Sequence, residues 1–254
     1  EIMAGDWSSD VCSSDLDLFK VKYDYHNVKA LLKAEAVGTA PDRMLMDMGR
    51  VSTAELAEAV RSRELDGLPE TLAAAVVEAR EVLDTTRDPQ LSDIVLDRWC
   101  YRDMAALAEE TGSAFLRGYV AVQVDAVNLR TAVRTLRMGK GADFLLGALL
   151  EGGDLAPDAV AKAASSGAAG LRELYGATRF RDAAEAGAEA LKGGPLTAFE
   201  KLCDDAVGDY LAGAQSVPFG EAPLVSYLAA RETEYTNLRI LLMGRAAGID
   251  PAVI

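Results

Sequence analysis

The pattern of apolar and polar positions along the chain is helical almost everywhere after its first sixteen residues. In residues 17–36 the apolar side chains recur mainly three or seven positions apart, as they do on one face of a helix. No segment shows the alternation of apolar and polar residues, bounded by turns, that a β-strand requires. The pattern therefore predicts an all-α protein.

Capping and helix-breaking residues mark where the expected helices begin and end. Ser52, followed three residues later by Glu55, forms a capping box that opens a short helix. The longer helices are expected to start at Pro, Asp-Pro or Gly-Ser and to stop at Gly. They span residues 69–85, 88–110, 113–138, 195–214 and 221–244. Between these, residues 142–194 are broken by Gly and Pro into several short segments.

A six-residue phrase occurs three times along the chain. It reads acidic, two variable residues, Asn, aliphatic, basic, and stands at residues 24–29, 125–130 and 234–239. The asparagines of successive copies are separated by 101 and 109 residues. Each copy continues into aliphatic residues and a glycine, which we place at Gly38, Gly139 and Gly244. A pattern repeated at a fixed period indicates that one supersecondary unit has been duplicated.

The period is too long for a solenoid repeat and indicates whole helical lobes. An offset of 107 residues also superposes residues 93–98 on 200–205, which adds an acidic-faced helix to the unit. We therefore expect a remnant of a first lobe at residues 17–40, a second lobe at 41–141 and a third at 142–254.

The acid and the asparagine of each phrase lie three positions apart, on one helical face. Asparagine is unfavourable inside a helix, so three copies indicate a required hydrogen bond to a neighbouring element. We expect a structural polar clamp; a ligand site is the alternative interpretation. The residues of this repeat motif are Asp24, Asn27, Lys29, Asp125, Asn128, Arg130, Glu234, Asn237 and Arg239.

Residues 1–16 differ from the rest of the chain. They have no helical period, repeat Ser-Ser-Asp, and lack the basic start and long apolar stretch of a signal peptide. The segment resembles a translated sequencing adapter. We expect it to be non-native, with the native chain starting in mid-protein near Asp17.

The charge and the cysteine content exclude several classes of protein. Forty acidic against 26 basic residues give a net charge of −14, which disfavours DNA or RNA as a ligand. The sequence contains no run of eighteen apolar residues, so no membrane span is predicted. Cys12, Cys100, Cys203 and the single histidine, His26, show no disulfide or zinc spacing. We expect no metal, no cofactor and a reducing cytosol.

A cluster of aspartates offers an enzymatic alternative. Asp204, Asp205 and Asp209 resemble the aspartate-rich motif that binds Mg²⁺ and diphosphate in all-α isoprenoid synthases. However, the third aspartate stands one position from its usual place, and no second cluster of that form occurs. A solvated acidic helix face is the favoured interpretation.

Three methionines alternate with other residues before Gly49: Met44, Met46 and Met48. Methionine fills gaps in cores and also forms adaptable contact surfaces. We expect the core role here.

Three stretches, in the same order, resemble one protein family. Residues 23–32, 88–98 and 216–245 are similar to the C subunit of bacterial and archaeal V/A-type ATPases, the equivalent of the eukaryotic V-ATPase d subunit (AC39). The resemblance covers residues 17–254 and implies a funnel of three similar helical lobes with pseudo-threefold symmetry. It also implies that most of the first lobe is missing and that the chain stops just short of the usual final helix.

The resemblance implies a non-catalytic central-rotor subunit that couples the central stalk to the membrane ring for ATP-linked proton or sodium transport. The expected partners are stalk subunits of D and F type and the rotor ring. The expected location is peripheral, on the cytoplasmic face of the plasma membrane. Two other functions remain open: a free-standing all-α interaction module, or an Mg²⁺-dependent enzyme that uses Asp205 and Asp209.

Overall fold

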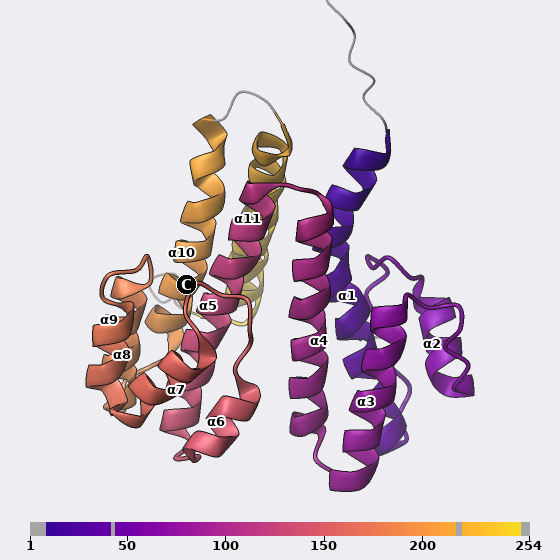
Figure 1. Ribbon diagram of the computed structural model, residues 1–254, viewed down its shortest axis with the longest axis horizontal. Coiled ribbons are helices and arrows are strands. Elements are labelled where there is room, and N and C mark those ends of the chain that lie inside the picture. The colour runs from indigo at the N-terminus through magenta and orange to yellow at the C-terminus, as the bar shows by residue number, and fades with distance from the viewer. Residues whose placement is uncertain (1–8, 42–43, 217–219, 250–254) are drawn as a thin grey trace, which may run out of the picture. The chain divides into compact units, whose positions relative to one another are not determined.

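A computed structural model describes residues 9–41, 44–216 and 220–249, and all regular structure within these ranges is helical (Figure 1). The all-α class predicted from the sequence is therefore confirmed. The α-helices are α1 Ser9–Val37, α2 Thr53–Ser62, α3 Glu70–Thr86, α4 Pro89–Glu110, α5 Ala114–Arg137, α6 Ala142–Ala148, α7 Pro157–Ser165, α8 Gly167–Tyr175, α9 Arg181–Leu191, α10 Thr197–Ala212 and α11 Glu221–Ala246. A 3₁₀ turn, η1 Gly213–Ser216, joins α10 to the segment before α11.

The chain forms two compact units, Glu1–Ala161 and Lys162–Ile254. In the first unit, α4 packs against both α1 and α3, and α5 packs against α4. In the second unit, α9 packs against both α8 and α10. The lobe boundaries after residues 40 and 141 divide the chain differently and stay a prediction.

The core of the first unit is aliphatic. Leu18, Val21 and Val28 of α1 and Leu96 of α4 are completely buried. Burial of each such side chain contributes roughly 1.5–3 kcal/mol to folding. This apolar packing fixes α1 against α4 and so positions the polar residues on the same helices.

The expected caps start three of the helices. Ser52 accepts a hydrogen bond from the Glu55 amide at 3.3 Å and opens α2. Asp88 accepts from the Gln90 amide at 2.9 Å and opens α4, and Ser113 accepts from the Leu116 amide at 3.1 Å and opens α5. Helix α1 differs, because it begins at Ser9 rather than near residue 17. Residues 1–8 of the segment predicted to be non-native lie outside the described residues, and its non-native origin stays a prediction.

The three helices that carry the repeated phrase end in the same way. Gly38, Gly139 and Gly248 each stand eleven residues after the asparagine of their copy and have φ of +73°, +66° and +71°. The residue after each glycine donates its amide proton back across the last turn, as in a Schellman motif. The bonds are Thr39 N to Ala34 O at 2.9 Å, Lys140 N to Thr135 O at 3.2 Å and Ile249 N to Gly244 O at 2.9 Å. The assignment of Gly244 as the third stop was wrong, because Gly244 lies inside α11 and accepts this bond.

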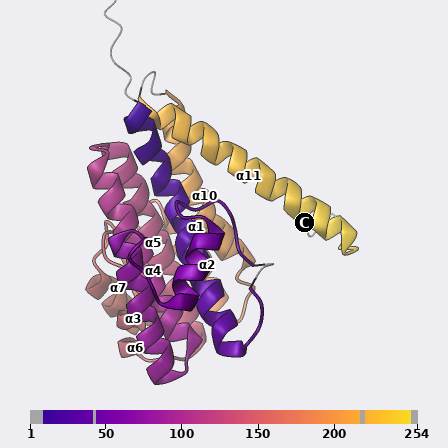
Figure 2. The same cartoon turned by 90° about the vertical axis from the view of Figure 1, so that its right-hand side faces the viewer.

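Among the described residues, helix α11 packs on the rest of the second unit through its start. Ala222, Val225 and Ser226 are buried there, and α11 packs on η1 and α10. From Tyr227 onward Gly244 is the only buried residue of the helix. Figure 2 shows α11 diverging from α10 along its length.

Candidate functional site

The first copy of the repeated phrase holds the loop that follows α1. Asn27 is completely buried, and its Nδ2 donates to the carbonyl oxygen of Met46 at 2.8 Å. Its Oδ1 accepts from the backbone amide of the same residue, also at 2.8 Å. The asparagine amide therefore pairs with one residue of the loop through both main-chain groups, as a neighbouring strand would.

The second copy, on α5, repeats this geometry with the loop between α6 and α7. Asn128 Nδ2 donates to the carbonyl oxygen of Leu150, and its Oδ1 accepts from the Leu150 amide, both at 2.8 Å. Asn128 is also completely buried. The two asparagines thus make hydrogen bonds of the kind expected from the sequence.

The acid of each phrase binds the same loop a few residues further on. Asp24 accepts from the Val51 amide at 3.2 Å and Asp125 from the Leu155 amide, also at 3.2 Å. Asp125 accepts a second bond from the Asp154 amide at 3.1 Å. We call Asp24 and Asn27 with residues 46–51 the first clamp, and Asp125 and Asn128 with residues 150–155 the second clamp. The second clamp satisfies the buried amide and carbonyl of Leu150, which would otherwise cost about 1–3 kcal/mol apiece. The main-chain groups that the first clamp satisfies are half-buried.

Each clamp contains a glycine that sequence reasoning missed. A Cβ on Gly49 would lie 2.1 Å from Asp24 Oδ1, and one on Gly153 would lie 2.2 Å from Asp125 Oδ1. Neither glycine has a positive φ, so it is the close approach of the carboxylate that requires them. The signal was present, because both loops read apolar, acidic, any residue, Gly, charged, aliphatic. Its spacing from the phrase differs by three residues between the copies, which hides it from a fixed-period comparison.

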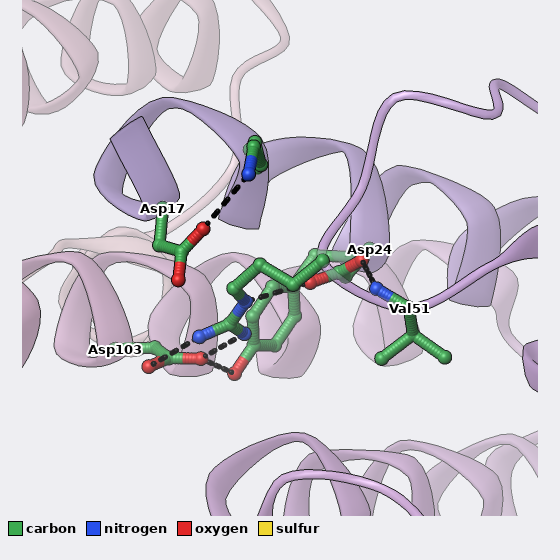
Figure 3. Close-up of polar contacts among 7 residues, drawn as sticks. Asp17, Asp24, Val51 and Asp103 are labelled. Carbon is green, nitrogen blue, oxygen red and sulfur yellow. Dashed lines mark hydrogen bonds and ion pairs between the residues drawn. The ribbon is translucent and has the colours of Figure 1, made fainter. Parts of the chain in front are cut away.

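The first clamp also contains a buried ionic cluster, drawn in Figure 3. Arg50 Nε donates to Asp24 Oδ2 at 2.8 Å, and Arg50 Nη2 donates to Asp103 Oδ2 of α4 at 2.7 Å. Tyr25 Oη donates to the same Asp103 oxygen at 3.2 Å. The guanidinium therefore links the loop after α1 to both α1 and α4. In the second clamp Asp154 stands in the place of Arg50, so this cluster belongs to the first clamp alone.

Burial governs the ionisation of this cluster. Burial raises the pKa of the Tyr25 hydroxyl far above its ordinary value, and the neighbouring Asp103 carboxylate adds to the rise. For Arg50, burial lowers the pKa, but the hydrogen bonds to Asp103 and Asp24 more than offset this and leave it raised. Tyr25 therefore stays a neutral donor and Arg50 stays charged at neutral pH.

The basic residue of the first phrase points to another helix. Lys29 Nζ bonds Asp97 of α4, and one turn later Lys33 Nζ bonds Asp93. These two pairs join α1 to α4. Arg130, the basic residue of the second phrase, is half-buried, and Arg239 of the third is exposed.

The third copy does not form a clamp in this structure. Glu234 and Asn237 are exposed, and Glu234 pairs with Arg231 on the same helix. Among the described residues no hydrogen bond holds the Asn237 side chain, so the expected interhelical bond is absent there. The physical reason is that, among the described residues of the second unit, no loop lies on this face of α11.

The remaining candidates carry no convergent chemistry. Asp205 is paired with Lys201 on the surface of α10. Within the described ranges, no group of three or more His, Cys, Asp or Glu side chains could hold a metal ion. His26 Nε2 lies 3.0 Å from the Met44 carbonyl oxygen at the surface. This geometry gives no support to the Mg²⁺-dependent enzyme.

The three methionines lie outside the core. Met44, Met46 and Met48 are 48%, 41% and 58% exposed, so their expected core role was wrong. Each clamp holds the main chain of its loop, and in the first clamp the methionine side chains face outward. No helix among the described residues is long and apolar enough to span a membrane.

Comparison with known proteins gives a consistent match. The chain is 26% identical to the C subunit of the V-type sodium ATPase of Enterococcus hirae, over 90% of this chain and 69% of that protein. It is 27% identical to the C subunit of the V-type ATP synthase of Thermus thermophilus, over 93% and 72%, respectively. It is 25% identical to the C subunit of the A-type ATP synthase of Methanocaldococcus jannaschii, over 97% and 65%. The family model of the ATP synthase (C/AC39) subunit matches residues 6–254, and the chain therefore belongs to that family.

Proposed function

We propose that this chain is the central-rotor subunit that couples the stalk of a V/A-type ATPase to its membrane ring. The observation that carries the proposal is the family match over residues 6–254. Membership makes the chain a structural subunit of a rotary ATPase rather than an enzyme. The finer role, torque transmission for ATP-linked proton or sodium transport, is the part proposed here.

The construction of the first unit suits a part that transmits force. Two long helices, α1 and α5, each hold a loop later in the chain by pairing an asparagine side chain with its main chain. The cluster of Arg50, Asp24 and Asp103 then ties one of these loops to α4. Buried networks of this kind rigidify a fold when every member is satisfied. A rigid unit passes on a load that a flexible one would absorb.

The proposed partners are the stalk subunits of D and F type and the rotor ring, on the cytoplasmic face of the membrane. The net charge of −14 supports association through complementary electrostatics with basic surfaces. Charge of this sign gives no support to binding of nucleic acid.

A binding assay tests the proposal. The chain is mixed with a purified D–F stalk pair, and complex formation is measured at low and high salt. We expect a complex that weakens as salt rises, because screening reduces steering between opposite charges. A stable monomer with no affinity for stalk or ring would instead support a free-standing interaction module.

An ATPase assay of the isolated chain provides the second arm. We expect no turnover above buffer, and the same result for Asp205→Ala. Turnover or Mg²⁺ binding that Asp205→Ala abolishes would overturn the rotor role in favour of the metal-dependent enzyme.

A further inference from the structure

A cavity of about 180 Å³ lies among α1, α4 and α5. All of the residues that line it belong to the first unit, so that unit forms the cavity by itself. An apolar cavity of about 150 Å³ is known to hold a benzene molecule. The cavity is therefore large enough for a ligand with a single ring.

Aromatic and aliphatic side chains form one part of the cavity wall. Phe19 of α1 and Tyr119 of α5 lie with their ring centroids 5.5 Å apart and an interplanar angle of 31°. The buried side chains of Leu18 and Met104 extend this apolar part. Aromatic rings attract one another in offset and tilted arrangements, so the wall suits a further flat ring.

The polar part of the wall is rich in hydrogen-bond donors. Besides one carboxylate, that of Asp97, it contains Lys22, His26, Lys29, Tyr101 and Gln123. Asp97 is already paired with Lys29, whose ammonium group has two further protons to donate. Two lysines against one aspartate give the cavity an excess of positive charge, although the whole chain has a net charge of −14.

Tyr101 offers a donor that the protein itself does not use. Among the described residues no hydrogen bond engages its hydroxyl, which is nevertheless not sealed from solvent. Burial raises the pKa of this hydroxyl far above its ordinary value, and the nearby Cys100 and Asp97 add to the rise. Tyr101 therefore stays a neutral O–H donor at neutral pH, and a negatively charged acceptor would satisfy it.

We propose that this cavity binds a small aromatic carboxylate. The ring of the ligand packs against Phe19 and Tyr119. Its carboxylate accepts hydrogen bonds from the Tyr101 hydroxyl and the Lys22 ammonium group. Charge-assisted hydrogen bonds are stronger than neutral ones, so the carboxylate is preferred to a neutral group of the same shape. The inference rests on the cavity and does not depend on the rotor role.

Three ligands of similar shape and different charge test the proposal. At pH 7 benzoate is an anion, benzamide is neutral and benzamidine is a cation. The affinity of the full chain for each is measured by ligand-observed NMR titration at constant ionic strength. We expect benzoate to bind about tenfold more tightly than benzamide, because hydrogen bonds to a charged group contribute more than neutral ones. Benzamidine should bind most weakly.

Two variants test the residues assigned to the carboxylate. Tyr101→Phe removes only the hydroxyl, and Lys22→Gln removes the positive charge. Each should weaken benzoate binding by about tenfold, whereas Lys22→Gln should leave the affinity for benzamide nearly unchanged. Lys20→Gln is the matched control, because Lys20 lies on the same helix, pairs with Asp17 and does not line the cavity. Thermal unfolding without ligand shows whether each variant is folded.

Three outcomes would overturn the proposal. One is benzoate that does not bind, or binds no more tightly than benzamide. Another is an affinity for benzoate that neither Tyr101→Phe nor Lys22→Gln reduces, which would place the ligand elsewhere. The third is an equal loss of affinity in Lys20→Gln, which would reveal a general attraction of anions to lysines rather than a site.

Discussion

Asp103 on α4 accepts a 2.7 Å hydrogen bond from Arg50, a residue 53 positions earlier in the loop after α1. Asp103 is 4% exposed and the Arg50 side chain 13%, so the pair is largely shielded from water. Arg50 is at the same time bonded to Asp24 at 2.8 Å. One guanidinium therefore neutralises part of the charge of two buried carboxylates, and the whole cluster depends on it.

Removing Arg50 should destabilise the chain strongly. Arg50→Met leaves Asp24 and Asp103 buried without a cation, and we expect a loss of about 3–5 kcal/mol in the free energy of unfolding. Urea unfolding at pH 7 measures it. The double variant Arg50→Met, Asp103→Asn should lose less than the single one, because one stranded charge is gone. Equal losses would show that the carboxylates are not coupled through Arg50.

Arg61→Met provides the surface control for that experiment. Arg61 pairs with Glu58 on the exposed face of α2. Exposed ion pairs of this kind contribute little to stability. We expect its unfolding curve to overlay that of the parent chain.

The second clamp should be sensitive to its asparagine. Asn128→Leu leaves the buried amide and carbonyl of Leu150 without partners, and we expect a loss of roughly 1–3 kcal/mol. Asn237→Leu is the matched control on an exposed face, where a change within about 0.5 kcal/mol is expected. If both variants lose the same free energy of unfolding, the side chain of Asn128 is not held more strongly than that of the exposed Asn237, which would contradict the structure.

The clamp glycine should not tolerate even a methyl group. In Gly153→Ala the added carbon would lie 2.2 Å from Asp125 Oδ1, and relieving the overlap should cost about 1–3 kcal/mol. Gly208→Ala is the control, because Gly208 lies inside α10 with nothing within 4 Å of the added carbon. Alanine is the better helix former, so this variant should gain about 0.5–1 kcal/mol. Opposite signs in thermal unfolding are the expected result.

Cys100 should make the stability depend on pH in the alkaline range. Burial raises the pKa of its thiol from 9.0 to about 12, and the nearby Asp97 carboxylate adds to the rise. The Cys100 thiol of the unfolded chain loses its proton near pH 9, whereas that of the folded chain keeps its proton up to about pH 12. The contribution is therefore complete below pH 9 and is lost as the pH rises from 9 towards 12.

The measurement compares the parent chain with Cys100→Ala between pH 8 and 10.5. We expect the parent to lose stability more steeply, by at most about 1.4 kcal/mol per pH unit. Tyr25 and Tyr101, whose pKa values are also raised by burial, are present in both proteins, so the difference reports the Cys100 thiol together with its electrostatic coupling to these two hydroxyls. Parallel curves of stability against pH for the two proteins would show that folding does not raise the pKa of the Cys100 thiol.

Local chemistry explains which parts of the fold could be predicted. A cap acts over three residues, so Ser52, Asp88 and Ser113 located their helices from sequence alone. The periodicity of apolar residues gave the all-α class. Residues 9–16 lack that periodicity, yet they continue α1, and this extension was missed.

The clamps were only half visible in the sequence. The acid and the asparagine repeat as side chains and could be found, but their partners are main-chain groups 19–30 residues away. A main-chain group leaves no mark in the sequence except where a glycine is required. The ion pair between Arg50 and Asp103 was missed for another reason, since it depends on the packing of α1 against α4.

The clamps bind main-chain groups and require a glycine in the loop. Most of the other loop side chains therefore do not take part in holding the loop. At one pair of equivalent places the loops carry the exposed Met48 and Gly152, and at another Arg50, which binds Asp24 and Asp103, is replaced by the exposed Asp154. The same scaffold therefore tolerates divergent outer surfaces. After a duplication, the outer face of each copy can diverge, while the acid, the asparagine and the glycine preserve the loop shape that the two clamps share.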